Sequence, residues 1–262
     1  PLRRALYSPW RRGTVRPVHL TVSPWVLLTV LAFLVPWSDL RRQLRGKLYQ
    51  LAATVLRLHL QRRERATVLV YVGQITVGGA SGLVQRIMRV RGPLVLLLDS
   101  PGGDIQSGLQ IAHALAVHPA AVTIRAPDQC DSAATIAACA ADRIVMGPHA
   151  HIGYTDAILH VDTTDLRAGP VVAAEKLGTT VELQRSRSTL ARIAAGLADA
   201  MVARGRHGDA ARTLAQRLTF TEDDHWTPLF PEHARELGLS VEVDPDDRRW
   251  YLLAYLSSWS HP

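Results

Sequence analysis

The sequence predicts an α/β fold with parallel strands, formed by one domain that follows an N-terminal appendage. Apolar runs of strand length alternate with helical patterns from residue 67 to residue 146, which is typical of a parallel sheet covered by helices. The run Leu94–Leu98 is continuously apolar, as expected for a strand buried on both faces. With 262 residues, of which 47% are hydrophobic, the chain can bury one sizeable core.

The N-terminal quarter is strongly basic, whereas the rest of the chain is acidic. Residues 1–65 contain 13 basic and two acidic residues, a net charge of +11, so the remaining residues carry −4 of the total of +7. Residues 1–19 are interpreted as a basic tail. Such charge favours a membrane surface or a nucleic acid as neighbour. We expect membrane lipid and no nucleic acid, because the basic residues flank an apolar segment and no nucleic-acid-binding motif is present.

An uncharged run covers residues 20–37, with Trp25 and Trp37 near its ends. As a helix it would span roughly 27 Å, close to the ~30 Å hydrocarbon core of a bilayer. It predicts a transmembrane or membrane-anchoring helix, hence a membrane-localised protein, single-pass or peripheral, whose orientation the flanking arginines leave unresolved. The alternative is a hydrophobic helix docked on the domain or in an oligomer contact. Residues 39–65 predict a basic amphipathic helix that lies along lipid headgroups or packs on the domain.

The domain proper is assigned to residues 66–262. Its predicted strands cover residues 67–72, 94–98, 121–124, 143–146 and 239–243. A loop at 73–82 precedes the first predicted helix, which ends at residue 90, and later helices cover 105–117, 133–141, 171–204, 209–217 and 231–237. Gly238 is expected to cap the last helix. Cys130 and Cys139 have the spacing of no known metal motif, so we expect packing residues and no metal site.

Ser132 is a candidate nucleophile because it is expected at the start of a helix. The local positive potential and the N–H group of the next residue favour an oxyanion there. Serine is also a preferred N-cap, and most serines at helix starts only cap. Gly102 and Gly103 favour catalysis, since a glycine pair after a buried strand lets the backbone approach a ligand and offers unobstructed N–H donors. An ordinary turn before a helix is the alternative.

Two motifs and their order carry a family resemblance. They are Leu98-Asp99-Ser100-Pro101-Gly102-Gly103 before a helix, and Asp131-Ser132-Ala133-Ala134-Thr135 followed by Ala141–Pro148. Over about residues 60–260 the chain resembles the Clp/crotonase-fold serine peptidases, most of all the serine dehydrogenase proteinase family, which is related to signal peptide peptidase A. The resemblance implies a Clp/crotonase-like fold of repeated β-β-α units, a nucleophilic Ser132, an oxyanion hole formed by Gly103 and Ala133, and a homo-oligomer.

Three further segments match the family, and one position departs from it. Residues 152–156 occupy the position of the sequence Leu-Gly-Pro-Val-Asp in relatives. This match implies a supporting or substrate-binding role for Asp156. Residues 224–228 and 234–239 resemble the family's C-terminal segments, and His225 is given a supporting role there. Relatives usually carry glycine where Ala134 stands. Its methyl group can narrow the site, so an inactive scaffold that binds unfolded or membrane peptides is the alternative function.

Lys176 is assigned as the general base. Only Lys47 and Lys176 are lysines among 30 basic residues, so arginine is the chain's default cation. Arginine does not release its proton at neutral pH, whereas burial lowers the pKa of a lysine. Ser-Lys relatives carry their lysine at the corresponding place, early in a helix. His149, His151 and His225 are kept as reserve bases.

These expectations describe a membrane-associated serine endopeptidase that cleaves peptide or protein substrates through an acyl-enzyme and a Ser132–Lys176 dyad. No cofactor is expected, because serine and lysine supply both the nucleophile and the base. An acyl-CoA enzyme of the crotonase branch has less support, since no coenzyme-binding feature accompanies the serine.

Overall fold

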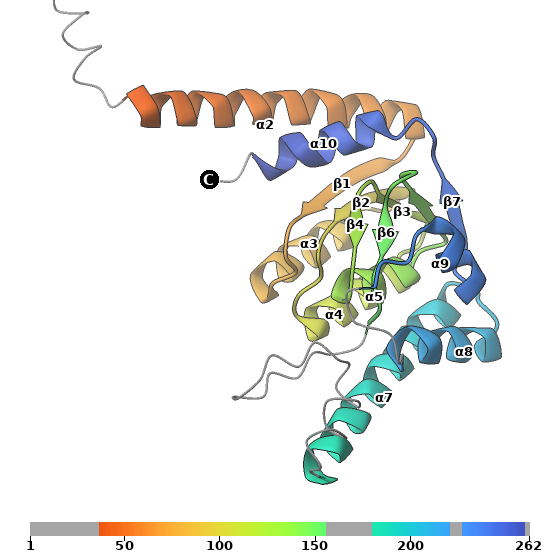
Figure 1. The fold of residues 1–262 in the computed structure, drawn as a ribbon. Helices are drawn as coiled ribbons and strands as arrows, with labels where there is room; N and C mark the ends of the chain where they lie inside the picture. The colour runs from red at the N-terminus through yellow and green to blue at the C-terminus, as the bar shows by residue number, and fades with distance from the viewer. Residues whose placement is uncertain (1–36, 156–179, 221–226, 260–262) are drawn as a thin grey trace, which may run out of the picture. The chain divides into compact units, whose positions relative to one another are not determined.

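The computed structural model describes residues 37–155, 180–220 and 227–259 (Figure 1). The chain divides into two compact units, residues 1–45 and 46–262. Of the first unit, the structure describes only the start of helix α2, which runs from Trp37 to Glu64. The second unit contains the sheet, the remaining helices and the candidate site.

A five-stranded parallel sheet forms the centre of the second unit. Its strands stand in the order β1-β2-β3-β5-β7, and every neighbouring pair is parallel. The bounds are β1 Thr67–Val72, β2 Leu94–Asp99, β3 Val122–Ala126, β5 Arg143–Met146 and β7 Val241–Val243. Because the strands are parallel, the turns that follow them meet at one edge of the sheet. The α/β fold predicted from the sequence is confirmed.

Helices cover both faces of the sheet, which explains why β2 is apolar throughout. Leu96 belongs to the larger core cluster, whereas its neighbour Leu97 belongs to a second cluster with Leu60 of α2 and Trp250, because successive side chains of a strand point to opposite faces. In Figure 1, α2 and α10 lie on one side of the sheet and α3, α4 and α5 on the other. The bounds are α3 Val77–Arg89, α4 Ile105–Ala116, α5 Ala133–Cys139 and α10 Arg248–Ser258.

Two very short strands, β4 (Gln129–Cys130) and β6 (His151–Ile152), form a second parallel sheet beside the first. Ser100, which follows β2, bridges to Cys130, and Ile152 bridges to Leu229. The remaining helices are α7 Thr180–Ala203, α8 Gly208–Thr219 and α9 Pro231–Leu237. Gly238 caps α9 in the left-handed conformation, as predicted. The small sheet therefore connects the turn after β2 with the turn after β4.

The loop predicted for residues 73–82 is wrong in its second half, because α3 already begins at Val77. The Thr76 side chain accepts a hydrogen bond from the Gly79 N–H and caps the helix. A Cβ atom at Gly79 would lie 2.6 Å from the hydroxyl oxygen of Tyr71, so glycine permits the close packing of α3 on β1. Packing and capping here outweigh the low helix propensity of glycine. Helix α10 and the strands β4 and β6 were not predicted.

The expected transmembrane helix and membrane localisation are contradicted. In the part of the chain that the structure describes, no helix is both long enough and apolar enough to cross a bilayer. The longest described helix, α2, has 28 residues but contains arginines near both ends, and a charged side chain inside hydrocarbon is costly. Leu60 of α2 is instead buried against the sheet. The rest of the run at 20–37 precedes the described residues.

Candidate active site

The turn after β2 places two glycines in backbone conformations that other residues rarely adopt. Gly102 has φ 91° and Gly103 has φ 141°. A Cβ atom at Gly103 would lie 2.2 Å from the carbonyl oxygen of Ile75, so only glycine fits this turn. The Gly102 N–H donates to Ser100 Oγ at 3.1 Å, and Asp104 caps α4 by accepting from the Ser107 N–H at 2.8 Å. Hydrogen bonds thus hold the turn on both sides of the two glycines.

The turn after β4 holds Ser132 in a strained backbone conformation. Its φ is 52° and its ψ is −115°, a region that costs a non-glycine residue about 1–3 kcal/mol. Ser132 precedes α5, yet its side chain makes no capping hydrogen bond. The residue is 7% exposed. The hydroxyl is thus left without the capping role that serines at helix starts usually have.

The two turns lie directly against each other. A Cβ atom at Gly102 would lie 2.6 Å from the carbonyl oxygen of Asp131 and 2.7 Å from the Cβ of Ser132. The Asp131 N–H donates to the Ser100 carbonyl at 3.0 Å, which joins the turns through the backbone. The structure therefore brings together Gly102, Gly103, Ser132 and Ala133, four of the residues that the sequence singled out.

Two backbone N–H groups beside Ser132 have no hydrogen-bond acceptor among the described residues, those of Gly103 and Ala133. By contrast, the Ala134 N–H donates to the Asp131 carbonyl at 2.9 Å. Ala133 is buried and Gly103 is partly buried. Buried backbone donors are nearly always paired, so the unpaired donor of Ala133 is unusual. The two donors are suited to an oxyanion that forms next to Ser132.

Thr135 and Ala134 support the Ser132 turn from inside the core. The buried Thr135 hydroxyl lies 2.7 Å from the Cys130 carbonyl oxygen and 2.8 Å from that of Gly153, so it connects β4 with the segment after β6. Ala134 is fully buried in the main core cluster. The Ala134 side chain therefore packs in the core. The sequence had suggested that this methyl group narrows the catalytic site.

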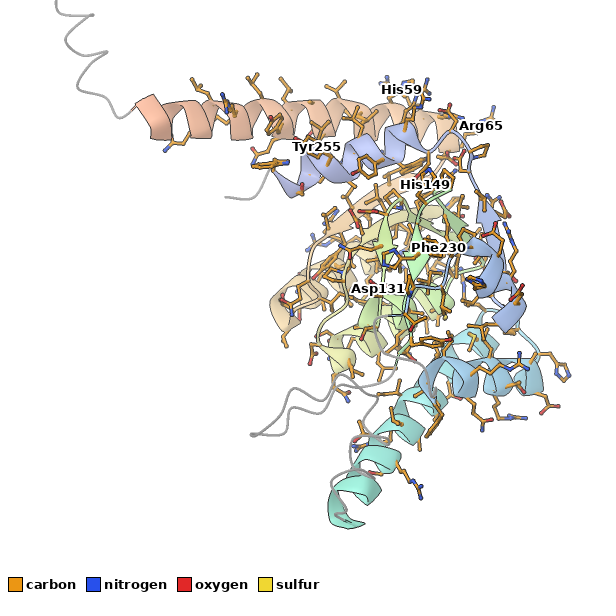
Figure 2. The ribbon with its side chains drawn as sticks, in the orientation of Figure 1. His59, Arg65, Asp131, His149, Phe230 and Tyr255 are labelled. Carbon is orange, nitrogen blue, oxygen red and sulfur yellow. The ribbon has the colours of Figure 1, made fainter. Side chains whose placement is uncertain are left out.

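Asp131 pairs with His151, a contact that the sequence did not predict. His151 Nε2 lies 3.2 Å from Asp131 Oδ2, and the ring packs edge-on against Phe230. Figure 2 shows Asp131 beside the short strands, with Phe230 nearby. The hydrogen bond to Asp131 raises the pKa of His151 above its ordinary value, although burial opposes the shift. The two residues are 20 positions apart, and strands of two residues have no sequence signal that would pair them.

Asp99 and Asp128 complete an acidic surrounding for this pair. Burial raises the pKa of Asp99 to about 6, against a hydrogen bond from the Gln129 N–H that lowers it. The charges of Asp128 and Asp99 also raise the pKa of His151. Within residues 37–155, 180–220 and 227–259, no group of three or more His, Cys, Asp or Glu side chains is arranged to hold a metal ion.

Three predicted site residues, Lys176, Asp156 and His225, lie outside the described residues, so their roles stay predictions. His149, a reserve base, is exposed. Both cysteines are buried free thiols, and burial raises the pKa of Cys139 to about 12.

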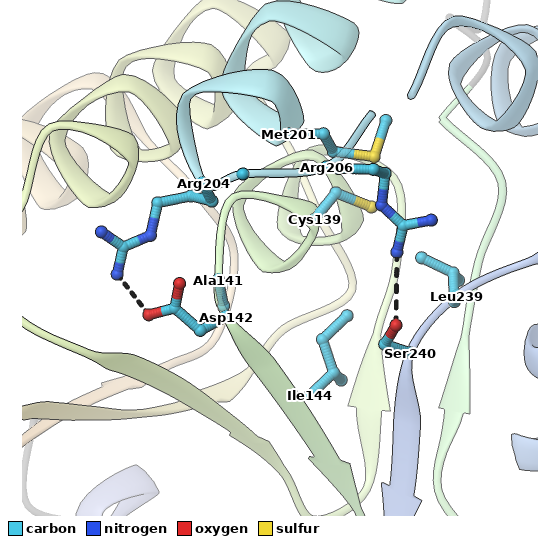
Figure 3. A pocket seen from close by; sticks show the side chains of 10 residues that line it. Cys139, Ala141, Asp142, Ile144, Met201, Arg204, Arg206, Leu239 and Ser240 are labelled. Carbon is cyan, nitrogen blue, oxygen red and sulfur yellow. Dashed lines mark hydrogen bonds and ion pairs between the residues drawn. The ribbon is translucent and has the colours of Figure 1, made fainter. Parts of the chain in front are cut away.

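A cavity of about 270 Å³ opens at the far end of α5 from Ser132. Figure 3 shows its two arginines already engaged, Arg204 with Asp142 and Arg206 with Ser240. Arg204 also donates to the carbonyl groups of His118 and Ala120. Both arginines follow α7 and bind residues that lie just before the strands β3, β5 and β7. They have a structural role, so we assign the cavity no part in the chemistry.

Three solved structures are similar to this chain. A mutant of the 1510-N membrane-bound stomatin-specific protease is 20% identical, covers 69% of this chain and 80% of its own, and has a TM-score of 0.49. A second mutant of that protease, in complex with a substrate peptide, is 21% identical over 70% of this chain and 76% of its own, with a TM-score of 0.48. A ClpP1 mutant from Listeria monocytogenes is 14% identical over 73% and 99%, with a TM-score of 0.47.

Two curated proteins of Methanocaldococcus jannaschii are similar in sequence. The uncharacterized protein MJ0137 is 29% identical over 168 residues, which are 62% of this chain and 57% of the relative. The uncharacterized protein MJ1495 is 27% identical over 168 residues, 62% of this chain and 56% of the relative. The chain thus spans little more than half the length of these relatives.

The family model of the ClpP-like SDH-type serine proteinases matches residues 19–258. The match covers most of the chain and includes both turns of the candidate site. It confirms the resemblance that the Pro-Gly-Gly and Asp-Ser-Ala-Ala-Thr motifs indicated. The chain therefore belongs to the family of ClpP-like SDH-type serine proteinases.

Proposed function

We propose that the chain is a serine endopeptidase with Ser132 as its nucleophile. The observation that carries this proposal is the state of the Ser132 turn. Its serine is strained and makes no capping bond, and the two N–H donors beside it have no acceptor in the described part of the chain. A serine kept only for capping would bond its hydroxyl to the helix start, as Asp104 does with its carboxylate. Strain that serves no fold-stabilising contact is typical of catalytic residues.

The proposed reaction is acyl transfer in two steps. Ser132 Oγ attacks the peptide carbonyl and passes its proton to the base, and the N–H groups of Gly103 and Ala133 stabilise the oxyanion. The amine leaves with that proton, and an ester remains on Ser132. A water molecule then gives a proton to the same base and attacks the ester. The base passes this proton to Ser132 Oγ as the acyl–oxygen bond breaks, and the carboxylic acid is released. No redox step or cofactor is needed.

Lys176 is proposed as the base, with Asp156 and His225 in supporting roles, on the strength of the family motifs. Lys176→Arg keeps the charge and removes the ability to accept a proton at neutral pH. The variant should lose about 100-fold or more in kcat, the order expected for removing a general base, with an unchanged melting temperature. Wild-type activity in this variant would move the base role to His149, His151 or His225.

An electrophilic serine probe, such as a fluorophosphonate, tests the nucleophile directly. It should label the wild-type protein and not Ser132→Ala, because an activated hydroxyl beside an oxyanion hole reacts far faster than an ordinary one. Ser107→Ala is the matched control, since Ser107 also lies near a helix start but bonds its hydroxyl to Asp104 at 2.6 Å. It should leave labelling unchanged.

The second candidate function, a peptide-binding scaffold, rests on Ala134 in place of the usual glycine. Equal labelling of wild type and Ser132→Ala, or labelling of neither, together with measurable binding of unfolded peptides, would favour the scaffold. The expected homo-oligomer also stays a prediction, which light scattering of the purified protein would test.

A further inference from the structure

The Asp131 residue that precedes the nucleophile is held on two sides. On the β2 side, its N–H donates to the Ser100 carbonyl at 3.0 Å. On the β6 side, its carboxylate meets His151, with 3.2 Å between Oδ2 and Nε2. A Cβ atom at Gly153 would lie 2.7 Å from Asp131 Oδ1, so this glycine makes room for the carboxylate. These contacts hold the residue that immediately precedes Ser132 in the chain.

The electrostatics of this contact depend on one proton. Asp131 Oδ1 is buried and accepts no hydrogen bond from the described residues, a costly arrangement for a carboxylate without a cation beside it. Asp131, Asp128 and Asp99 all act on His151 with negative charge, and the segment before α9 adds the uncharged ring of Phe230. A protonated His151 offsets these negative charges, whereas a neutral one leaves them without this cation.

We propose that His151 is a positioning residue for the serine peptidase reaction: in its charged form, it holds Asp131 against Gly153 and so keeps Ser132 in its strained, uncapped conformation. The inference rests on the proposed function of Ser132. His151 does not touch the reacting atoms in this role. Loss of its proton frees the Asp131 carboxylate, the Ser132 turn relaxes, and turnover slows without a matching change in substrate binding.

The pH dependence follows from the direction of the shift. The folded-state pKa of His151 lies above its ordinary value of 6.5, so the contribution of the pair to stability is fully present below that value. It is lost as pH rises through the folded-state pKa. Deprotonation of His151 should lower activity as the pH rises, whereas deprotonation of a lysine base should raise it. The two titrations can therefore be separated.

Two variants isolate the charge of His151. His151→Arg is charged at every accessible pH, and His151→Gln is never charged but can still donate a hydrogen bond to Asp131. The ratio of wild-type to His151→Gln kcat should be about ten at pH 6 and approach one at high pH, as expected for a displaced nucleophile. The ratio of His151→Arg to wild-type kcat should rise about tenfold over the same range. Taking ratios cancels the titration of the base.

The closing measurements separate this inference from the proposed function. Melting temperatures of wild type and His151→Gln should differ most below pH 6.5 and converge as the pH rises, whether or not the protein is a peptidase. Should His151→Arg fail to fold, His151→Lys carries the same charge. Ser132-dependent activity with ratios that stay constant across pH would overturn the positioning role alone. Absence of any Ser132-dependent activity or labelling would overturn both.

Discussion

Helices α4 and α5 each begin at a turn that follows a parallel strand. The residues at their N-cap positions, however, make different contacts. Asp104 caps α4 through its side chain, which accepts from both the N–H and the hydroxyl of Ser107. Ser132 stands at the same place before α5 and caps nothing. Its φ of 52° departs from the extended conformation that capping residues usually adopt. The difference shows that a cap residue becomes available for chemistry when its backbone is held out of the capping conformation.

The largest expected effect comes from replacing the uncapped residue itself. Ser132→Gly should lower kcat/KM by about 10³-fold or more, as loss of a nucleophile does. The melting temperature should stay the same or rise, because glycine adopts a φ of 52° without strain. Activity and melting of the purified variant check both points. A large drop in melting temperature would show that Ser132 stabilises α5 after all.

The next effect concerns the contact that keeps Ser132 in place. Gly102→Ala adds a methyl group 2.7 Å from Ser132 Cβ, and we expect about a 100-fold loss of kcat, the order associated with a displacement of about 1 Å. Gly73→Ala is the matched control, since Gly73 also has positive φ, 100°, but has no atom within 4 Å of the added methyl group. It should cost about 1 kcal/mol in stability and leave kcat unchanged.

The start of helix α10 resembles that of α5, because the side chain of its N-cap residue makes no capping hydrogen bond. This N-cap residue is the buried acid Asp247. Burial raises the pKa of Asp247 to about 7, although Arg125 opposes the shift. Between the ordinary pKa of 3.8 and about 7, the folded state keeps a proton on Asp247 that the unfolded state has lost. The free energy of unfolding therefore falls as the pH rises through this range. Asp247→Asn should flatten the decline by up to about 1.4 kcal/mol per pH unit.

Urea unfolding at a series of pH values measures this slope. The exposed neighbour Asp246→Asn serves as the control and should leave the wild-type slope in place. Equal slopes in wild type and Asp247→Asn would mean that water reaches the carboxylate and that α10 starts like an ordinary exposed helix.

The smallest effect is that of an ordinary cap. Asp104→Ala removes the acceptor at the start of α4 and should cost about 1 kcal/mol of unfolding free energy. Thr76→Ala at the start of α3 should cost a similar amount, because its side chain caps in the same way. Thermal or urea unfolding gives both values. A serine-probe labelling rate that fell with Asp104→Ala as far as with Gly102→Ala would remove the distinction between the two helix starts.

Much of the fold follows from the sequence because burial on both faces leaves a strong pattern. Strands β1 and β5 have the predicted bounds, 67–72 and 143–146. The Pro-Gly-Gly turn and its family were also recognisable, since only glycine tolerates the backbone of Gly103. The start of α3 was misplaced, because the packing of Gly79 against Tyr71 is a tertiary contact that propensity does not contain.

The sequence by itself determined the α/β class, the family and the two turns, because these depend on local hydrophobic pattern and on residues with unusual backbone freedom. Only the tertiary structure decided that Ser132 is uncapped, since its conformation depends on Gly102 from another turn. The same holds for His151 and Asp131, which the pairing of β4 with β6 brings together. Strands of two residues carry too little pattern to reveal such a contact. The hydrogen bond to Asp131, which raises the pKa of His151, therefore appears only in the tertiary structure.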